Sequence, residues 1–433
     1  MKTFYIHSMG CKSNQFEGSI IIQNLEKNSF IEVKNPEEAD IFILNSCSVT
    51  SKSDSEAFYI LRNIKNKKPE IKTVLTGCIA QIEKEKLLEN EFIDFVVGND
   101  EKLNFYEILQ SLETSKSKCS ASDIMQLCEF HKVELEDTSK TRASLKIQDG
   151  CDSRCTYCII PFARGRSRSA DKKFIAEQIN KFSSHGFKEV VFTGIHIGQW
   201  GKDIGENLLD LIKYIEDNTT IERYRLGSLN PTEINEDLLE FLSKSEKFCP
   251  HFHLSLQSAC NKTLRSMNRF YKVENYLEQI EHINEIFNNP FLGSDIITGF
   301  AGETDEDFEI TRQNLERSGL SQIHTFPYSK RNGTVGASLP NQVDEKIKEM
   351  RATIVKEISA RKLDEFINKN IGTYQEVLIQ KHPDKKSGLL KGVTKNYLTV
   401  ILNSNDEKLL NTLAKVKIKK YHDSKIYAEY IEN

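Results

Sequence analysis

The stretch GCDSRCTYCIIPFARGRSRS, Gly150 to Ser169, places three cysteines within eight residues and then three arginines within five. Cysteines at this CxxxCxxC spacing can ligate zinc, form disulfides or hold an iron–sulfur cluster. The stretch supplies three ligands, Cys151, Cys155 and Cys158, whereas a structural zinc site needs four. A 4Fe–4S cluster held by three thiolates leaves one iron open to a small molecule. The spacing therefore favours a cluster, with a zinc-binding or RNA-binding module as the alternative.

The composition restricts the compartment and the partners. The chain has 433 residues, ten cysteines and a formal net charge of −4. It contains no run of about eighteen apolar residues and its start lacks the features of an export signal, so we expect a cytoplasmic protein without a membrane partner. Ten cysteines in a reducing compartment indicate metal or redox chemistry. The net charge disfavours a polyanionic partner unless basic residues are locally concentrated.

Residues 1–112 are predicted to form an open α/β sheet. Short β-rich runs at 3–6, 40–44 and 73–75 alternate with helical stretches. Three cysteines, in MGC, NSC and TGC, each follow one of these runs. Sites in such sheets form at the carboxyl ends of the strands, so the three thiols are expected to converge there. The alternative is that they are buried, inert thiols. The candidate ligands are Cys11, Cys47 and Cys78.

A polar segment, 113–141, separates this unit from the next. It is rich in Ser, Lys and Glu and has weak periodicity, which is typical of a linker. Cys119 and Cys128 lie in it without partner spacing, so we interpret them as incidental. Cys249 and Cys260, further along the chain, are interpreted as structural.

Residues 142–369 are predicted to form an incomplete parallel barrel. Strand-like and helical segments alternate six times, and the chemistry of such barrels lies at the carboxyl ends of the strands. The CxxxCxxC stretch directly follows the first of these strands. A helix over 342–369 closes the unit, with Gly372 after it. The predicted strands are 143–148, 189–193, 223–227, 251–256, 294–298 and 322–326.

Residues 370–433 contain short alternating runs typical of a small antiparallel barrel. From Ile371 to Asn433 there are eleven lysines and seven acidic residues, an excess of four positive charges on an otherwise acidic chain. A basic module of this kind can bind RNA through its phosphates, and a solvated lysine-rich face is the alternative. The lysines expected to contact RNA are Lys391, Lys395, Lys417, Lys419 and Lys420.

These motifs together resemble one enzyme family. CDSRCTYC looks like the cluster motif of radical S-adenosylmethionine (SAM) enzymes. Its combination with the three N-terminal cysteines and IIPFARGRSRS resembles the methylthiotransferases along essentially the whole chain. The resemblance implies that Cys151, Cys155 and Cys158 hold a 4Fe–4S cluster that binds SAM. It also implies that the N-terminal cysteines hold an auxiliary 4Fe–4S cluster, and that GVTKNYLTV belongs to a substrate-binding TRAM domain.

Further segments resemble the branch that acts on threonylcarbamoyl-adenosine beside the tRNA anticodon. They are TGIHIGQWG, HFHLSLQSACNKTLRSMNR, DIITGFAGETDEDF and HTFPYSKRNGT. Isopentenyl-adenosine in tRNA and a ribosomal-protein aspartate are the alternative substrates of this family. The resemblance further implies an electron donor, such as a flavodoxin or ferredoxin, and a sulfur donor.

Several residues are expected to contact SAM. Tyr157, between the cluster cysteines, is suited to pack against adenine, and glycines at strand ends let a ligand approach the backbone. The arginines are suited to bidentate pairing with a carboxylate or phosphates. The full set is Tyr157, Arg164, Arg166, Arg168, Gly194, Gly299 and Gly302.

Overall fold

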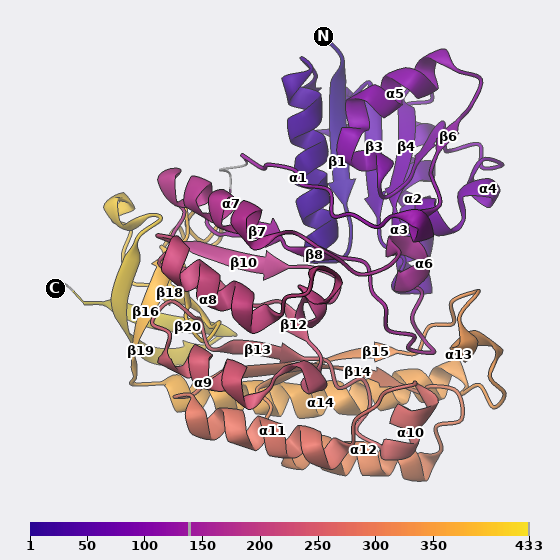
Figure 1. Cartoon of the computed structure of the whole chain (residues 1–433). Helices are drawn as coiled ribbons and strands as arrows, with labels where there is room; N and C mark the ends of the chain where they lie inside the picture. Colours follow the sequence, from indigo (N-terminus) through magenta and orange to yellow (C-terminus); the bar gives the residue numbers. More distant parts are fainter. Residues whose placement is uncertain (137–139, 432–433) are drawn as a thin grey trace.

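The computed structural model describes residues 1–136 and 140–431. Figure 1 shows an N-terminal sheet unit, a central set of strands flanked by helices, and a small barrel at the C-terminus. In the described part of the chain, no helix combines the length and the apolar character needed to cross a membrane.

The N-terminal unit is an open, fully parallel six-stranded sheet in the order β2-β1-β3-β4-β5-β6. β3 is buried throughout, as expected for a central parallel strand covered on both faces. This confirms the predicted open α/β domain. Its elements are β1 (Thr3–Ser8), α1 (Lys12–Lys27), β2 (Ile31–Glu32), β3 (Ile41–Ser46), α2 (Ser51–Lys67), β4 (Lys72–Gly77), α3 (Cys78–Ile82), α4 (Lys84–Leu87), β5 (Phe95–Val97), α5 (Phe105–Thr114) and β6 (Cys119–Ser120).

The segment predicted as a linker is partly built into the sheet. Its first residues end α5, and Cys119 lies on β6, which pairs with β5 at the sheet edge. Ile124 is buried, and its carbonyl lies close to Gly165 of the central unit. The segment around this strand has low hydrophobicity, and an edge strand of two residues has too few positions to display a pattern. The sequence therefore did not reveal it. Residues 137–139 of the segment lie outside the described residues.

The central unit is the predicted partial barrel of parallel strands, with seven strands among the described residues in place of the six predicted, because the region of the predicted strand 223–227 is divided into β11 and β12. The strands form two sheets, β11-β10-β7 and β12-β13-β14-β15, and the chain joins β11 to β12 across Leu226 and Gly227. Its strands are β7 (Ala143–Lys146), β10 (Glu189–Thr193), β11 (Arg223–Arg225), β12 (Ser228–Leu229), β13 (His251–Leu254), β14 (Phe291–Thr298) and β15 (Gln322–Pro327). Its principal helices are α7 (Lys172–Ser184), α8 (Leu208–Asn218), α9 (Glu236–Lys244), α11 (Val273–Ile286), α12 (Asp305–Arg317) and α14 (Glu345–Asn370).

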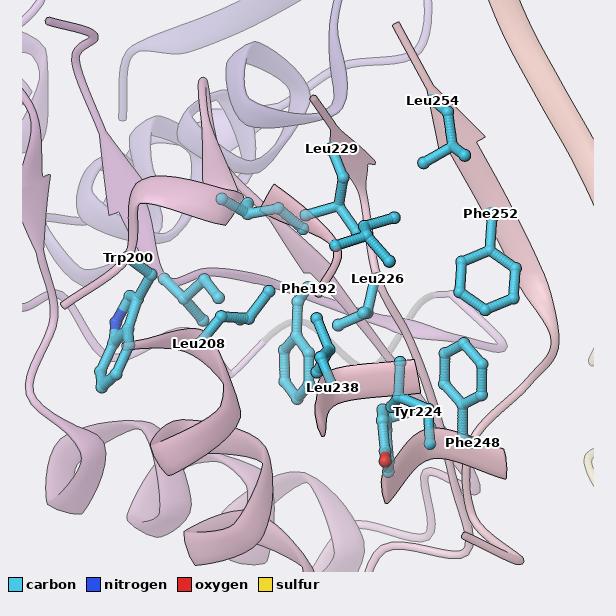
Figure 2. Close-up of a cluster of buried hydrophobic side chains, with 14 of the residues drawn as sticks. Phe192, Trp200, Leu208, Tyr224, Leu226, Leu229, Leu238, Phe248, Phe252 and Leu254 are labelled. Atoms are coloured by element: carbon cyan, nitrogen blue, oxygen red, sulfur yellow. The ribbon is translucent and has the colours of Figure 1, made fainter. Parts of the chain in front are cut away.

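Apolar side chains fill the space between these strands and the surrounding helices (Figure 2). Phe192, Tyr224 and Phe248 are buried there, with successive ring centroids 5.9 and 5.7 Å apart. Trp200, the single tryptophan, is fully buried and its indole N–H donates to the carbonyl of Ala170 at 2.9 Å. The satisfied indole explains how so large a residue is fully enclosed. Its place is in the core.

The C-terminal unit is a closed five-stranded barrel in the order β16-β17-β18-β20-β19. The predicted small barrel is confirmed, with one refinement: four strand pairs are antiparallel, whereas β18 and β20 are parallel. Gly372 adopts a φ of +85° where α14 gives way to the barrel, which favours glycine. The strands are β16 (Tyr374–Ile379), β17 (Lys391–Thr394), β18 (Thr399–Leu402), β19 (Leu413–His422) and β20 (Lys425–Tyr430).

This barrel docks on the amino ends of the central strands, on the side away from the chemistry expected at their carboxyl ends (Figure 1). Arg223, the first residue of β11, is buried and bonds Glu376 of β16 at 2.7 Å. Arg225 donates to the carbonyls of Thr394 and Lys395 at 2.7 and 2.6 Å. Because these guanidiniums are buried, the C-terminal barrel completes the core and is not a loosely tethered appendage.

Candidate cluster-binding sites and the cavity between them

The three N-terminal cysteines lie at the carboxyl ends of neighbouring strands. β1, β3 and β4 are adjacent in the sheet, and Cys11, Cys47 and Cys78 follow them within three residues. Gly10 makes this approach possible: it has a φ of +78°, and a Cβ there would lie 2.5 Å from the Cβ of Cys47 and 2.6 Å from its Sγ. Only glycine lets the first loop come this close to the second cysteine.

The electrostatics of these thiols show that they are neighbours. Burial raises the pKa of Cys47 to about 11, and the nearby thiols of Cys78 and Cys11 add to the shift. Cys47 and Cys78 are buried and Cys11 is exposed. A thiol with a raised pKa, such as that of Cys47, stays protonated on its own and releases its proton when iron binds. The donor set, three soft sulfurs around a cradle that a side chain at residue 10 would fill, fits a thiolate-bound cluster.

The second cysteine set lies in the loop between β8 (Gln148–Asp149) and β9 (Arg168–Ser169), two strands that pair antiparallel and close the base of the loop. Burial raises the pKa of Cys158 to about 12, with contributions from Cys155 and Cys151. Cys151 contacts the imidazole Nδ1 of His196 at 3.4 Å. The three thiols therefore share one pocket-facing loop at the carboxyl end of the first barrel strand, as the spacing predicted.

Neither cysteine set is arranged around one point. Among the described residues, no three His, Cys, Asp or Glu side chains converge closely enough to hold a single metal ion. A zinc site requires four ligands about 2.3 Å or less from one ion. Thiolates on different irons of a cluster do not share one centre. Each set offers three thiols, the donor number that leaves one iron of a 4Fe–4S cluster open and one fewer than a structural zinc site requires.

A cavity of about 240 Å³ lies between the two cysteine sets. Val49 and Thr50, just after Cys47, form one side of it, and Tyr157 and Cys158 form another. Side chains near the carboxyl ends of β14 and β15 form part of the remaining wall. The cavity is therefore the space that both cysteine loops border.

A buried ion-pair network fixes the N-terminal sheet unit to the central barrel. Glu17 of α1 pairs with Arg164 of α6 (Ile160–Arg164), with Lys102, and with Lys146 at 2.8 Å. Asp149 also pairs with Lys146, at 2.9 Å. The side chains of Glu17, Lys102 and Arg164 are at most 1% exposed. Burial opposes the charge on Arg164, but Glu17 and Cys78 raise its pKa well above the usual value.

The three arginines Arg164, Arg166 and Arg168 therefore have different environments. Arg164 is committed to the interdomain network. Arg168 is buried, lies 3.7 Å from Asp149, and donates to the carbonyls of Arg164 and Arg166 at 3.0 and 2.8 Å. Arg166 is exposed. The expected contact with a ligand carboxylate is geometrically open to Arg166, whereas Arg164 and Arg168 hold the cysteine loop and the domain interface.

The other expected SAM-contacting residues also differ in placement. Tyr157 lines the cavity and packs with Met267, Phe300 and Tyr328. Gly299 has a φ of +71°, and a Cβ there would overlap Lys348 of α14, so this glycine is required by helix packing. None of Gly194, Gly299 and Gly302 lines the described cavity.

An arginine that sequence reasoning did not single out lies against the loop that follows Cys47. Arg331, in the loop after β15, is buried, pairs with Asp54 of α2 at 2.5 Å and donates to the hydroxyl of Ser48. It thus ties the central barrel to the loop that follows Cys47. The only signal was its place in the segment SKRNGT, where a basic residue has no local pattern to mark it.

Comparison with known proteins agrees with this arrangement. Residues 3–98 match the uncharacterized protein family UPF0004, and residues 145–315 match the radical SAM superfamily. The chain is 36% identical to the threonylcarbamoyladenosine tRNA methylthiotransferase MtaB of Aquifex aeolicus, over 86% of this chain and 91% of that protein. The protein chain belongs to the radical SAM methylthiotransferase family. It is also 31% identical to the tRNA-2-methylthio-N(6)-dimethylallyladenosine synthase of Natranaerobius thermophilus, over 100% of this chain and 97% of that protein.

A solved structure supports the fold of this methylthiotransferase. The radical SAM methyltransferase TsrM of Kitasatospora setae, with cobalamin and a 4Fe–4S cluster bound, superimposes with a TM-score of 0.56 at 14% identity. The match covers 77% of this chain and 76% of that chain. At this identity the likeness concerns the fold alone.

Of the five predicted RNA-contacting lysines of the methylthiotransferase, one lies in a domain interface and the other four lie elsewhere on the C-terminal barrel. Lys395 donates to the carbonyl of Glu246 at 2.6 Å and so belongs to the interface with the central barrel. Lys417 lies 5.3 Å from the ring centroid of Tyr374, a residue that is 59% exposed. Lys391 is half-buried, while Lys419 and Lys420 are exposed on β19.

Proposed function

We propose that this protein attaches a methylthio group to the adenine ring of N(6)-threonylcarbamoyladenosine next to the anticodon of tRNA. The observation that carries the proposal is the cavity bordered by both cysteine loops, in a chain 36% identical to a protein named for this reaction. Cys151, Cys155 and Cys158 would hold the SAM-binding 4Fe–4S cluster. Cys11, Cys47 and Cys78 would hold the auxiliary one.

When bound, the clusters and SAM supply the one-electron chemistry that replacement of an aromatic C–H bond requires. The chain's own residues position and enclose the reactants. Tyr157 offers an aromatic face to a base or to SAM, and Ile297 and Phe326 supply apolar walls that exclude water. Arg331 and the Glu17 network keep the two cysteine loops on opposite sides of one cavity.

The C-terminal barrel supports a nucleic-acid substrate. Lys415 and Lys417 lie 5.9 and 5.3 Å from the ring centroid of exposed Tyr374, and Lys420 stands over the ring of Tyr427. An exposed aromatic ring flanked by lysines can stack on a base while the ammonium groups meet phosphates. A tRNA substrate and reduced cysteines also fit a cytoplasmic protein. We expect an electron donor and a sulfur donor to supply the reaction.

Anaerobic reconstitution followed by nucleoside analysis tests the proposal. The reconstituted protein is expected to be brown and to split SAM. It should convert the threonylcarbamoyl nucleoside of tRNA to its methylthio derivative, and Cys155→Ala should abolish SAM cleavage. Methylthio product found only on isopentenyl-adenosine would assign the other tRNA substrate, which similarity to the dimethylallyladenosine enzyme keeps as the second candidate. Colourless protein with bound zinc would refute the enzyme assignment.

A further inference from the structure

A second, larger cavity adjoins the one between the cysteine loops. It has a volume of about 800 Å³ and is bordered by the start of α2, by residues 81–86 and by residues 330–333. Ile159 lines both cavities. Ser51 and Ser329 form the ridge between them, since the amide and hydroxyl of Ser51 both lie 2.9 Å from the Ser329 hydroxyl. The two cavities are therefore neighbours across a single hydrogen-bonded ridge.

The lining of the second cavity has a slight excess of positive charge. Four basic side chains meet three acidic ones there: Lys84, Lys86, Lys330 and Arg331 against Asp54, Glu83 and Glu85. Most of the basic groups are occupied. Arg331 pairs with Asp54 at 2.5 Å, Lys86 with Glu83 at 3.7 Å, and Lys84 donates to the carbonyl of Ala121 at 3.0 Å.

Lys330 differs from these three. It is exposed, it follows the ridge residue Ser329 directly, and within the described part of the chain no hydrogen bond or ion pair occupies its ammonium. An unpaired ammonium at the rim between two cavities can pair with an anionic group of a molecule that spans both. A substrate arm that leaves the first cavity across the ridge would pass this ammonium.

We propose that Lys330 binds the carboxylate of the threonylcarbamoyl arm and thereby selects this substrate. The proposal rests on the proposed function. The reacting carbon, C2 of adenine, must face the cavity that both cysteine loops border. C2 and C6 flank N1, so the bond to N6 leaves the ring in a different direction from the C2–H bond, and we place the N6 substituent across the ridge, in the second cavity.

The two tRNA substrates of this family differ in the charge of the N6 substituent, which is the property that Lys330 would recognise. The threonylcarbamoyl arm carries a hydroxyl and a carboxylate that is ionised at neutral pH. An isopentenyl arm is neutral and apolar, so it gains nothing from the ammonium and displaces water from it. A hydrogen bond between charged groups at a partly exposed site corresponds to about a tenfold difference in affinity.

The test compares tRNA binding by the reconstituted full-length protein. Two tRNAs are used, identical except that one carries threonylcarbamoyl-adenosine and the other carries unmodified adenosine at that position. Lys330→Met is expected to weaken binding of the modified tRNA about tenfold and to leave the unmodified tRNA unchanged. Lys330→Arg should restore most of the preference. Lys86→Met is the matched control, because its ammonium faces Glu83 in the same cavity, and both affinities should stay as in the wild type.

Three outcomes would overturn the proposal. An unchanged ratio of the two affinities in Lys330→Met would show that the carboxylate is bound elsewhere. An equal loss for both tRNAs would show that Lys330 contacts the phosphate backbone. Loss of preference in Lys86→Met as well would mean that the overall charge of the cavity acts, and not Lys330. Failure of the proposed function is distinguishable, because then the wild-type protein itself would not prefer the threonylcarbamoyl tRNA.

Discussion

The buried carboxylate of Glu17 is the most consequential single charge in the domain interface, and Glu17→Gln removes it. In the wild type, this carboxylate pairs with Lys102, Lys146 and Arg164. After the change, Lys146 and Arg164 keep Asp149, at 2.9 and 3.7 Å. Lys102 keeps only side-chain amide oxygens, the nearest being Asn99 Oδ1 at 2.8 Å. The variant therefore holds one buried ammonium without a counter-charge.

Two estimates of the cost agree. Breaking a buried ion pair by removing one partner costs about 3–5 kcal/mol. Alternatively, Lys102 can lose its proton: for a group with an ordinary pKa of about 10.4, this costs about 4 kcal/mol at pH 7.5, which sets an upper limit. A loss of about 4 kcal/mol corresponds to a fall in melting temperature of about 8–16 °C for a unit of roughly this size.

Calorimetry of anaerobically purified protein at pH 7.5 measures this fall. The mechanism also has a pH signature. A neutral Lys102 in the folded variant becomes protonated on unfolding, so the unfolded state binds more protons and stability rises with pH. The deficit relative to the wild type should therefore shrink by about 1.4 kcal/mol between pH 7.5 and 8.5. Glu240→Gln, which breaks an exposed pair with Lys244, is the control and should leave the melting temperature unchanged. A fall below about 2 °C in Glu17→Gln, or a deficit that grows with pH, would refute the reasoning.

Three further predictions concern the other units. Cys47→Ala should lose about half of the iron and all methylthio product while SAM cleavage continues, as measured on one preparation; Cys128→Ala should lose neither. Burial and nearby cations lower the pKa of His251 far below its ordinary value, so this residue folds neutral and the wild type should lose stability as pH falls below about 6.5. His251→Phe should flatten that loss of melting temperature between pH 7 and 5.5. Replacement of Lys417, Lys419 and Lys420 by glutamate should weaken tRNA binding. The slope of the logarithm of the binding constant against the logarithm of salt concentration should fall in magnitude by up to about 3.

Each of these has an outcome that contradicts it. Full iron and wild-type product in Cys47→Ala would mean that this thiol is not a ligand. An unchanged pH profile in His251→Phe would show that other groups govern acid stability. Equal tRNA affinity after the lysine changes would show that this face of the C-terminal barrel does not meet RNA. Point changes are preferable to removal of the barrel, because its loss would expose Arg223 and Arg225 and destabilise the central unit.

The local sequence determined the order of the units and the cysteine positions. Cysteine spacing, alternation of apolar residues and turn residues act over a few positions, so they can be recognised in the sequence without knowledge of tertiary contacts. They placed Cys11, Cys47 and Cys78 at strand ends and Cys158 in the loop after the first barrel strand. Strand ends in a parallel sheet share one edge, which is why a one-dimensional pattern sufficed to place the three thiols at that edge.

Only the tertiary structure decided which charged groups are free. Arg164 and Arg166 are two residues apart in an equally basic stretch, yet one is buried against Glu17 and the other is exposed. The partner of Arg164 lies 147 positions earlier in the chain, and no local pattern encodes such a pairing. Likewise Lys395 is committed to a domain interface while Lys330 remains open. A charge's role depends on what faces it across the fold, and packing between distant segments sets that.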